Sequence, residues 1–169
     1  EGAFRVARFQ EEGVGTEKNV EEAVKGYRSA GASGYTHAYY YLGRCYALGI
    51  GVAADAKQAI FQWRHGANLG DAPCMYIAGY CYETGFGVTV DTELALYCYM
   101  EAHFRGDARA LKAFDRLKET LPPRRKNPRG GATLGPPAGI FWFENRKNRR
   151  RRHFFAKIAK NFQRGLEIV

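Results

Sequence analysis

Apolar and polar residues alternate along the middle of the chain with the spacing of short amphipathic helices. Within residues 36–48, Tyr40, Leu42 or Gly43, and Tyr46 recur three or four positions apart. This spacing places them on one side of a helix and gives one apolar stripe. The pattern therefore predicts a helix at residues 36–48 that packs along this stripe.

Glycine and aspartate residues mark the end of this helix and the start of the next one. Gly49 stands where a helix needs a left-handed C-terminal residue, and Gly51 keeps the following loop tight. Asp55 is of a type that accepts hydrogen bonds from the free amides of a starting helix, so a second helix is predicted just after it. On that helix Ala59 and Trp63 lie four residues apart, as a small residue for close helix approach and an aromatic wedge.

The helix pair recurs along the chain with a period of 36 residues. Residues 36–71 align with residues 72–107 without a gap, and 11 of the 36 positions are identical. Residues 1–35 are a more divergent copy in the same register, and residues 108–121 repeat the first helix as a polar-backed cap. Because one pair cannot bury its apolar face alone, neighbouring pairs must stack into a solenoid.

The repeated residues resemble a known family. The motif Ala38-x-Tyr40-x-Leu42-Gly43-x-x-Tyr46-x-x-Gly49-x-Gly51-Val52-x-x-Asp55-x-x-x-Ala59 and its copy from Cys74 to Ala95 are similar to Sel1-like repeats, relatives of the tetratricopeptide repeat. The resemblance covers about residues 1–115 and implies the superhelix of that family. It also implies an adaptor or scaffold that holds partners in its groove and usually has no chemistry of its own.

The predicted fold is all-α and has two parts. Residues 1–121 form a helical-pair solenoid, with units at about 1–35, 36–71 and 72–107 before the cap. Residues 122–169 are a basic C-terminal extension, which we call the basic tail. Its prolines and glycines favour an extended chain, and its end has the pattern of an amphipathic basic helix.

Positions of the first helices that stacking does not use are expected to line the groove. This surface mixes aromatic, apolar and basic groups, which suit a peptide or helix that carries apolar side chains and a carboxylate or two. The alternative is that Tyr41, Ile77 and the two cysteines complete the packing between units. The groove residues are Arg5, Arg8, Phe9, Tyr41, Arg44, Cys45, Leu48, Ile77, Tyr80, Cys81 and Thr84.

The charge is distributed unevenly between the two parts. Residues 1–121 carry 13 Lys and Arg against 15 Asp and Glu, whereas the basic tail carries 13 against 2. This asymmetry predicts a polyanionic partner for the tail: RNA, an anionic membrane or an acidic protein face. RNA is favoured, since Arg forks match phosphate oxygens and aromatic rings stack on unpaired bases. The predicted RNA-binding residues are Arg124, Arg125, Lys126, Arg129, Arg146, Lys147, Arg149, Arg150, Arg151, Arg152, Lys157 and Lys160.

The basic tail also contains large apolar side chains. Left exposed, they would be costly, so we expect them to dock on the solenoid, on another subunit or, for the helical group, on a bilayer. The docking residues are Phe141, Trp142, Phe143, Phe154, Phe155, Ile158 and Phe162.

Signatures of catalysis, metal binding and cofactors are missing from the sequence. There is no Gly-x-Ser-x-Gly elbow, no H-E-x-x-H pair, no phosphate loop and no CxxC pair. Cys98 and His103 are the one nucleophile-base pair at short spacing, and we interpret both as packing or solvent-facing residues. Cys74 and Cys81 would lie about 10 Å apart on one helix, too far for a disulfide. We therefore expect a non-enzyme with no cofactor or metal and with free thiols, in a reducing compartment.

These features support two functional hypotheses. The first is a non-catalytic subunit of an RNA-containing assembly such as an organellar ribosome, in which the solenoid binds neighbouring proteins and the basic tail binds RNA. The second is a soluble regulatory adaptor whose groove recruits a client and whose tail binds an anionic membrane or serves as an import signal. The first hypothesis favours the mitochondrion, with cytoplasm or nucleus as alternatives.

Overall fold

The computed structural model describes residues 1–121. The predicted RNA-binding and docking residues, which run from Arg124 to Phe162, lie outside this part. The described residues form helices and no strand. The helices are α1 Gly2–Glu12, α2 Val20–Ala32, α3 Ala38–Leu48, α4 Ala56–Asn68, α5 Ala72–Thr84, α6 Thr92–Phe104 and α7 Ala108–Thr120.

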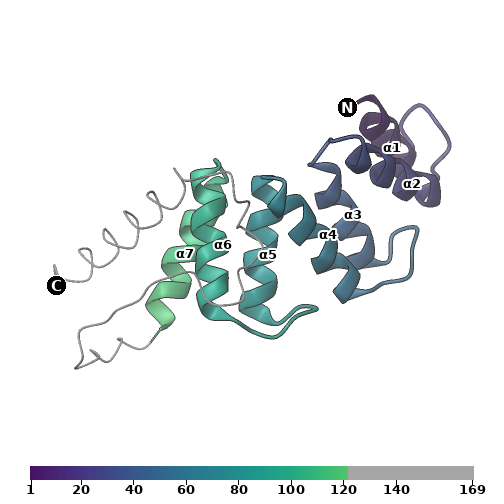
Figure 1. Ribbon diagram of the computed structural model, residues 1–169. Helices are drawn as coiled ribbons and strands as arrows, with labels where there is room; N and C mark the ends of the chain where they lie inside the picture. The colour runs from purple at the N-terminus through teal and green to yellow at the C-terminus, as the bar shows by residue number, and fades with distance from the viewer. Residues whose placement is uncertain (122–169) are drawn as a thin grey trace, which may run out of the picture. The chain divides into compact units, whose positions relative to one another are not determined.

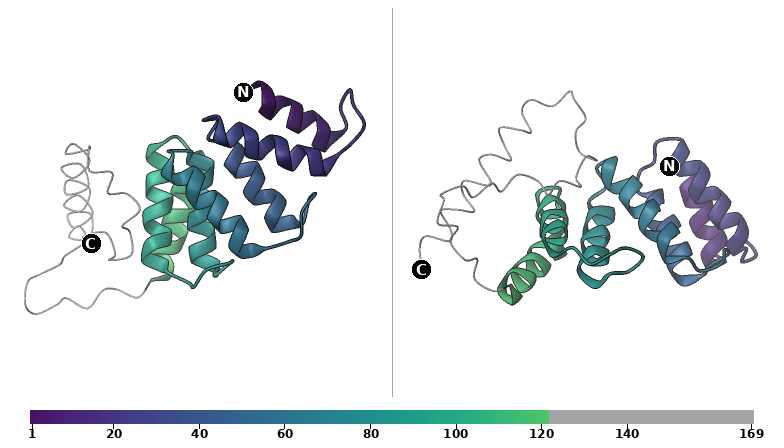
Figure 2. Two further views of the ribbon diagram at one scale, coloured as in Figure 1. Left: turned by 45° about the vertical axis from the view of Figure 1, so that its right-hand side comes forward. Right: turned by 60° about the horizontal axis from the view of Figure 1, so that its bottom comes forward.

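The seven helices stack in chain order as helical pairs (Figure 1). α1 packs on α2, α3 on α4 and α5 on α6, and each pair contacts the next through α2 and α3, α4 and α5, or α6 and α7. The further views show the same order of neighbours (Figure 2). The predicted all-α helical-pair solenoid is confirmed. None of the helices in residues 1–121 has the length and apolar character needed to cross a membrane.

The predicted caps of the second helices are present in each unit. The side chains of Asn19, Asp55 and Asp91 accept hydrogen bonds from backbone amides in the first turns of α2, α4 and α6. Asp71 and Asp107 cap α5 and α7 in the same way, a role that was not predicted from the sequence. These side chains satisfy amides that the helix itself leaves free, so each helix begins at a defined residue.

The glycine turn does more than shorten a loop. Gly49 ends α3 with φ of 71°, as predicted. Gly51 has φ of 66°, and a Cβ there would lie 2.4 Å from the Val20 carbonyl oxygen. A Cβ on Gly87 would likewise lie 2.2 Å from the Ala56 carbonyl oxygen. The second glycine therefore lets the loop of one unit touch the second helix of the unit before it.

Small residues let the two helices of each unit approach closely. A Cβ on Gly43 would lie 2.3 Å from Nε1 of Trp63, and one on Gly79 would lie 2.9 Å from the ring of Tyr99. In the first unit the glycine is on the other helix, because Ala7 takes the place of Gly43 and Gly26 of α2 faces it. A Cβ on Gly26 would lie 2.7 Å from that of Ala7.

The core lies between the two layers of helices and contains the aromatic wedges. Tyr27, Trp63 and Tyr99, the predicted wedge positions, are buried. On α3 the buried stripe is Ala38, Leu42 and Cys45, and the tyrosines at 40 and 46 that the sequence analysis placed on it are half-buried. Tyr46 packs at the edge of the core cluster that contains Ala38, Leu42 and Cys45, so it is only partly covered.

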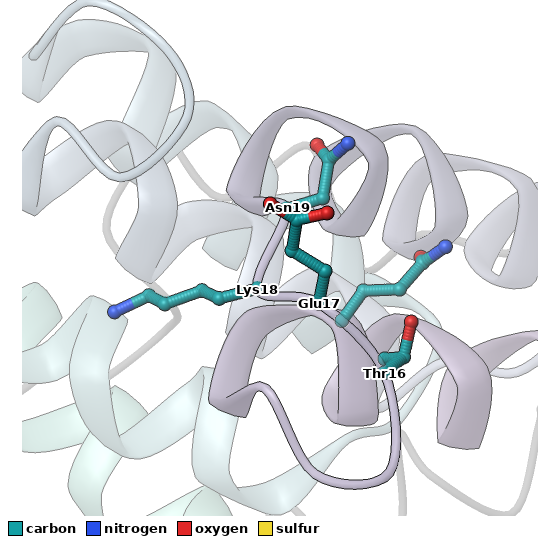
Figure 3. A pocket seen from close by; sticks show the side chains of 5 residues that line it. Thr16, Glu17, Lys18 and Asn19 are labelled. Carbon is teal, nitrogen blue, oxygen red and sulfur yellow. The ribbon is translucent and has the colours of Figure 1, made fainter.

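A polar hollow lies at the loop between α1 and α2 (Figure 3). It measures about 310 Å³ and is lined by Gln10 and residues 16–19. The backbone N–H of Asn19 donates to the backbone carbonyl of Gln10 over 2.8 Å, which holds the loop against the end of α1. The hollow contains none of the predicted groove residues.

Candidate protein-interaction surface

The first helices of successive units, α1, α3, α5 and α7, contact one another through their side chains. Arg8 of α1 donates to the Tyr41 hydroxyl of α3 over 2.6 Å. α3 contacts α5, and Arg116 of α7 pairs with Glu83 of α5. Positions 5, 8 and 12 of the first unit recur every 36 residues in the later units. We call the surface that these positions form the first-helix face. It carries the predicted residues Arg5, Arg8, Tyr41, Arg44, Leu48, Ile77, Tyr80 and Thr84.

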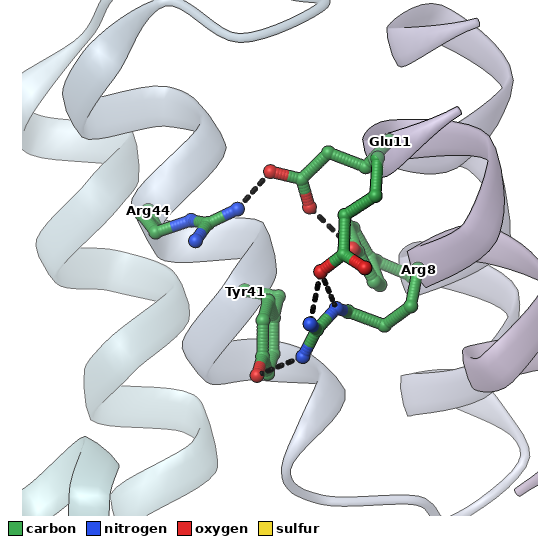
Figure 4. Close-up of polar contacts among 6 residues, drawn as sticks. Arg8, Glu11, Tyr41 and Arg44 are labelled. Atoms are coloured by element: carbon green, nitrogen blue, oxygen red, sulfur yellow. Dashed lines mark hydrogen bonds and ion pairs between the residues drawn. The ribbon is translucent and has the colours of Figure 1, made fainter. Parts of the chain in front are cut away.

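A polar cluster joins α1, α2 and α3 at the first joint (Figure 4). Glu11 accepts a hydrogen bond from the Tyr27 hydroxyl over 2.5 Å and forms an ion pair with Arg44. Arg8 pairs with Glu12 of its own helix. The guanidinium carbons of Arg8 and Arg44 lie 5.0 and 5.2 Å from the centroid of the Tyr41 ring, close enough for cation–π attraction.

The same cluster recurs 72 residues later at the third joint, among α5, α6 and α7. Glu83 accepts from the Tyr99 hydroxyl over 2.5 Å and pairs with Arg116 at 2.8 Å. Burial and this hydrogen bond raise the pKa of Tyr99, so the phenol stays a donor. The sequence analysis missed Glu11 and Glu83, although the recurrence of Glu, Tyr and Arg at the same register was a readable signal.

The second joint, among α3, α4 and α5, lacks this cluster. The equivalent positions hold Ala47, Trp63 and Tyr80. Trp63 Nε1 donates to the Tyr40 carbonyl over 3.0 Å, within its own unit. Leu48, Tyr80 and Thr84 are exposed here. We call Ala47, Leu48, Tyr80 and Thr84 the middle patch.

Several predicted groove residues lie elsewhere or are partly used in packing. Cys45 and Cys81 are fully buried, as the alternative in which they complete the packing requires. Cys45 belongs to the core cluster that includes Tyr27 of the preceding unit. Phe9 is at the equivalent position of α1 and is exposed. Tyr41 and Ile77 are half-buried, and Tyr41 stacks on Tyr27 at 5.4 Å.

The four cysteines are free and buried. Burial raises the pKa of Cys81 and of Cys98 to about 12. Burial also raises the pKa of Cys45 and Cys74. The Cys98 thiol is thus protonated at neutral pH and largely shielded from solvent, which argues against a role as nucleophile with His103. Within residues 1–121, no three His, Cys, Asp or Glu side chains are grouped to hold a metal ion.

A buried carboxylate links α3 and α5 at the opposite end of the helices. Asp71 Oδ2 lies 2.9 Å from His37 Nδ1, and Asp71 Oδ1 accepts from the Cys74 amide over 2.9 Å. Burial raises the pKa of Asp71, but the hydrogen bonds from His37 and the Cys74 amide outweigh it and hold this pKa below its usual value. We assign this group a structural role, because both contacts hold one unit on the next.

Comparisons with known proteins agree with this geometry. The model of the Sel1 repeat matches residues 1–35, 36–71 and 72–102. A Sel1 repeat protein from Oxalobacter formigenes superposes with a TM-score of 0.64 and 33% identity, over 66% of this chain and 45% of that one. The antigen c5321, present in uropathogenic Escherichia coli strains and displaying an SLR fold, gives a TM-score of 0.65 and 25% identity, over 68% and 25%.

This chain spans less than half the length of either structure. No curated protein matches it. Sel1 repeat proteins are typically protein-interaction scaffolds, and their fold is typically non-catalytic. The three matched repeats cover more than half of the sequence and coincide with the helical pairs of the structure. The chain therefore belongs to the Sel1 repeat family.

Proposed function

We propose that this protein is a non-catalytic scaffold whose first-helix face binds a protein partner. The observation that carries this proposal is the row of exposed or half-buried Arg, Tyr and Leu side chains on helices that polar clusters hold together. Arg44 and Arg8 are fixed by Glu11 and Glu12, so little side-chain entropy is lost when a partner contacts them. A fixed row of anchors is what a scaffold needs to bind an extended or helical segment.

We further propose that the basic tail binds RNA and makes the protein a subunit of an RNA-containing assembly, such as an organellar ribosome in the mitochondrion. The sequence supports this, because the tail carries 13 Lys and Arg against 2 Asp and Glu, with aromatic residues among them. Residues 1–121 have an excess of acidic residues, which leaves the tail as the cationic part. Protein binding and RNA binding would then reside in separate parts of the chain.

Binding to single-stranded RNA at several salt concentrations tests the RNA proposal. If about six tail arginines neutralise phosphates, log K should fall against log salt with a slope of about −4. Deletion of residues 122–169 should abolish the binding. Vesicles of matched anionic charge are the control, and tighter binding to vesicles than to RNA would favour the membrane-bound adaptor instead.

Sedimentation of the native protein tests the assembly directly. The protein is recovered from its source at low salt and separated on a sucrose gradient. Migration with a large particle, lost after nuclease treatment, is the expected result. Migration as a small species without RNA would contradict the assembly proposal while leaving the protein-binding scaffold intact.

A further inference from the structure

The middle patch differs from the two joints beside it. At the first and third joints a glutamate and an arginine bridge successive first helices, whereas Ala47 and Tyr80 occupy these positions at the second. Leu48 is 66% exposed and Tyr80 is 48% exposed. The Thr84 hydroxyl donates to the Tyr80 carbonyl over 2.8 Å, so this hydroxyl already has a hydrogen-bond partner. The middle patch therefore carries no charged side chain, and its Leu48, Tyr80 and Thr84 are exposed within residues 1–121.

Positive charge faces outward on both sides of this patch. The side chain of Glu11 is 10% exposed and that of its partner Arg44 is 36% exposed. At the third joint Glu83 is 16% exposed and Arg116 is 61% exposed. The carboxylates thus lie behind the guanidinium groups. Since both ion pairs use Nη2 of the arginine, other N–H donors of each guanidinium are left for a second acceptor.

One further observation concerns Arg44 itself. Its Nε is buried and has no hydrogen-bond partner among residues 1–121. An unpaired buried donor is costly, so the Arg44 guanidinium has hydrogen-bonding capacity that its ion pair with Glu11 does not use. The face therefore complements an acidic ligand rather than a basic one.

The register of the repeats sets the spacing of these groups. Arg44, Tyr80 and Arg116 are equivalent positions in successive units. α3 contacts α5, and the Glu83–Arg116 ion pair links α5 to α7, so each arginine lies about one spacing of neighbouring helices, about 8–10 Å, from Tyr80. An extended chain rises about 3.3 Å per residue and crosses that spacing in about three residues.

We propose that the middle patch binds a large apolar side chain of an extended protein segment, with carboxylates about three residues to either side on Arg44 and Arg116. This inference rests on the proposed scaffold function and specifies its ligand. The ligand is a segment with a central aromatic or aliphatic residue and an acidic residue three positions before it and three positions after it. The missing ion pair at the second joint is what leaves room for the anchor.

Selection from a random displayed peptide library tests the inference. The full chain is the bait, at about 150 mM salt, where exposed charges are screened beyond about 8 Å. The variant A47E/Y80R is a second bait. It restores the glutamate and arginine of the other joints without changing the net charge. We expect the proposed pattern to be enriched on the natural chain and to bind the variant about thirtyfold more weakly, as for loss of a central anchor.

A matched control places the same residue types outside the face. Q58E/F61R on α4 also adds one Glu and one Arg at exposed positions, and it should bind the selected peptides as the natural chain does. Circular dichroism melting of both variants shows whether each is folded. Peptides that bind the basic tail would bind all three proteins equally.

The outcomes separate this inference from the function on which it rests. Enriched peptides that bind A47E/Y80R and the natural chain equally would overturn the middle patch but leave a protein-binding scaffold. Enriched peptides without flanking acidic residues would overturn the role of the arginines. If no peptide is enriched on the natural chain, both the inference and the proposed recognition of a protein segment fail.

Discussion

The close approach of the two helices in a unit depends on a glycine, which lies on the second helix in the first unit and on the first helix in the third unit. Moving this glycine from one helix to the other tests its role. In the third unit Gly79 of α5 lies against Tyr99 and Cys98 of α6, whereas the first unit has Ala7 and Gly26 at the same two positions. The variant G79A/C98G gives the third unit the arrangement of the first, since both units use a tyrosine wedge. We expect the two substitutions to compensate one another.

The structure gives the size of each single effect. A Cβ at Gly79 would lie 2.9 Å from two ring atoms of Tyr99 and 3.2 Å from the Cys98 Cβ. Over-packing of this kind costs about 1–3 kcal/mol, and the higher helix propensity of alanine returns up to about 1 kcal/mol. C98G removes a buried side chain and adds a helical glycine, for a loss of about 2 kcal/mol.

Urea unfolding of the full chain, followed by helical circular dichroism, measures the cycle. The double variant should be more stable than the sum of the singles predicts, by at least about 1 kcal/mol. The reciprocal cycle in the first unit, A7G with G26A, is the matched control and should show coupling of the same sign. Additivity within about 0.5 kcal/mol in both cycles would refute the close-approach explanation.

Four further results are expected. Y99F removes the hydroxyl that donates to Glu83 and should lower the free energy of unfolding by about 0.5–1.5 kcal/mol in urea titrations. The folded-state pKa of Asp71 lies below its unfolded value, so its stabilisation is present at neutral pH and is lost on acidification through that folded pKa; D71N should flatten this part of the stability–pH curve. The four thiols should resist Ellman's reagent until the protein unfolds, and a fast-reacting thiol would contradict their burial. A chain cut after residue 121 should remain helical and melt cooperatively, and an unfolded product would show that the basic tail contributes to the core.

Local chemistry explains why so much of the fold was predictable. The turn at Gly49 requires a left-handed residue, and the cap at Asp55 requires a side-chain acceptor, so each is visible in a single stretch of sequence. The period of 36 residues then extended these local predictions to the whole solenoid. Which side of each first helix faces a partner was harder to predict, because the apolar Cys45 and Cys81 directly follow the groove positions Arg44 and Tyr80 in the sequence.

The candidate site depended on which neighbour covers each stripe. From the sequence, Cys45 could lie in the groove or complete the packing between units, and the structure buries it in a cluster with residues of the preceding unit. Glu11 and Arg44 are 33 residues apart and meet only because α1 and α3 lie side by side. No pattern within one helix could indicate that contact, although comparison of equivalent joints could have done so.

The sequence by itself determined the helices, their caps, the repeat and the division between a near-neutral solenoid and a basic tail, because these follow from backbone chemistry, apolar periodicity and charge. Only the tertiary structure decided which side chains face a partner. Stacking buried the cysteines, placed the carboxylates of Glu11 and Glu83 behind their arginines and left Tyr80 and Leu48 uncovered. Whether a side chain is exposed depends on which neighbouring unit packs against it, and the sequence of a single unit does not contain that information.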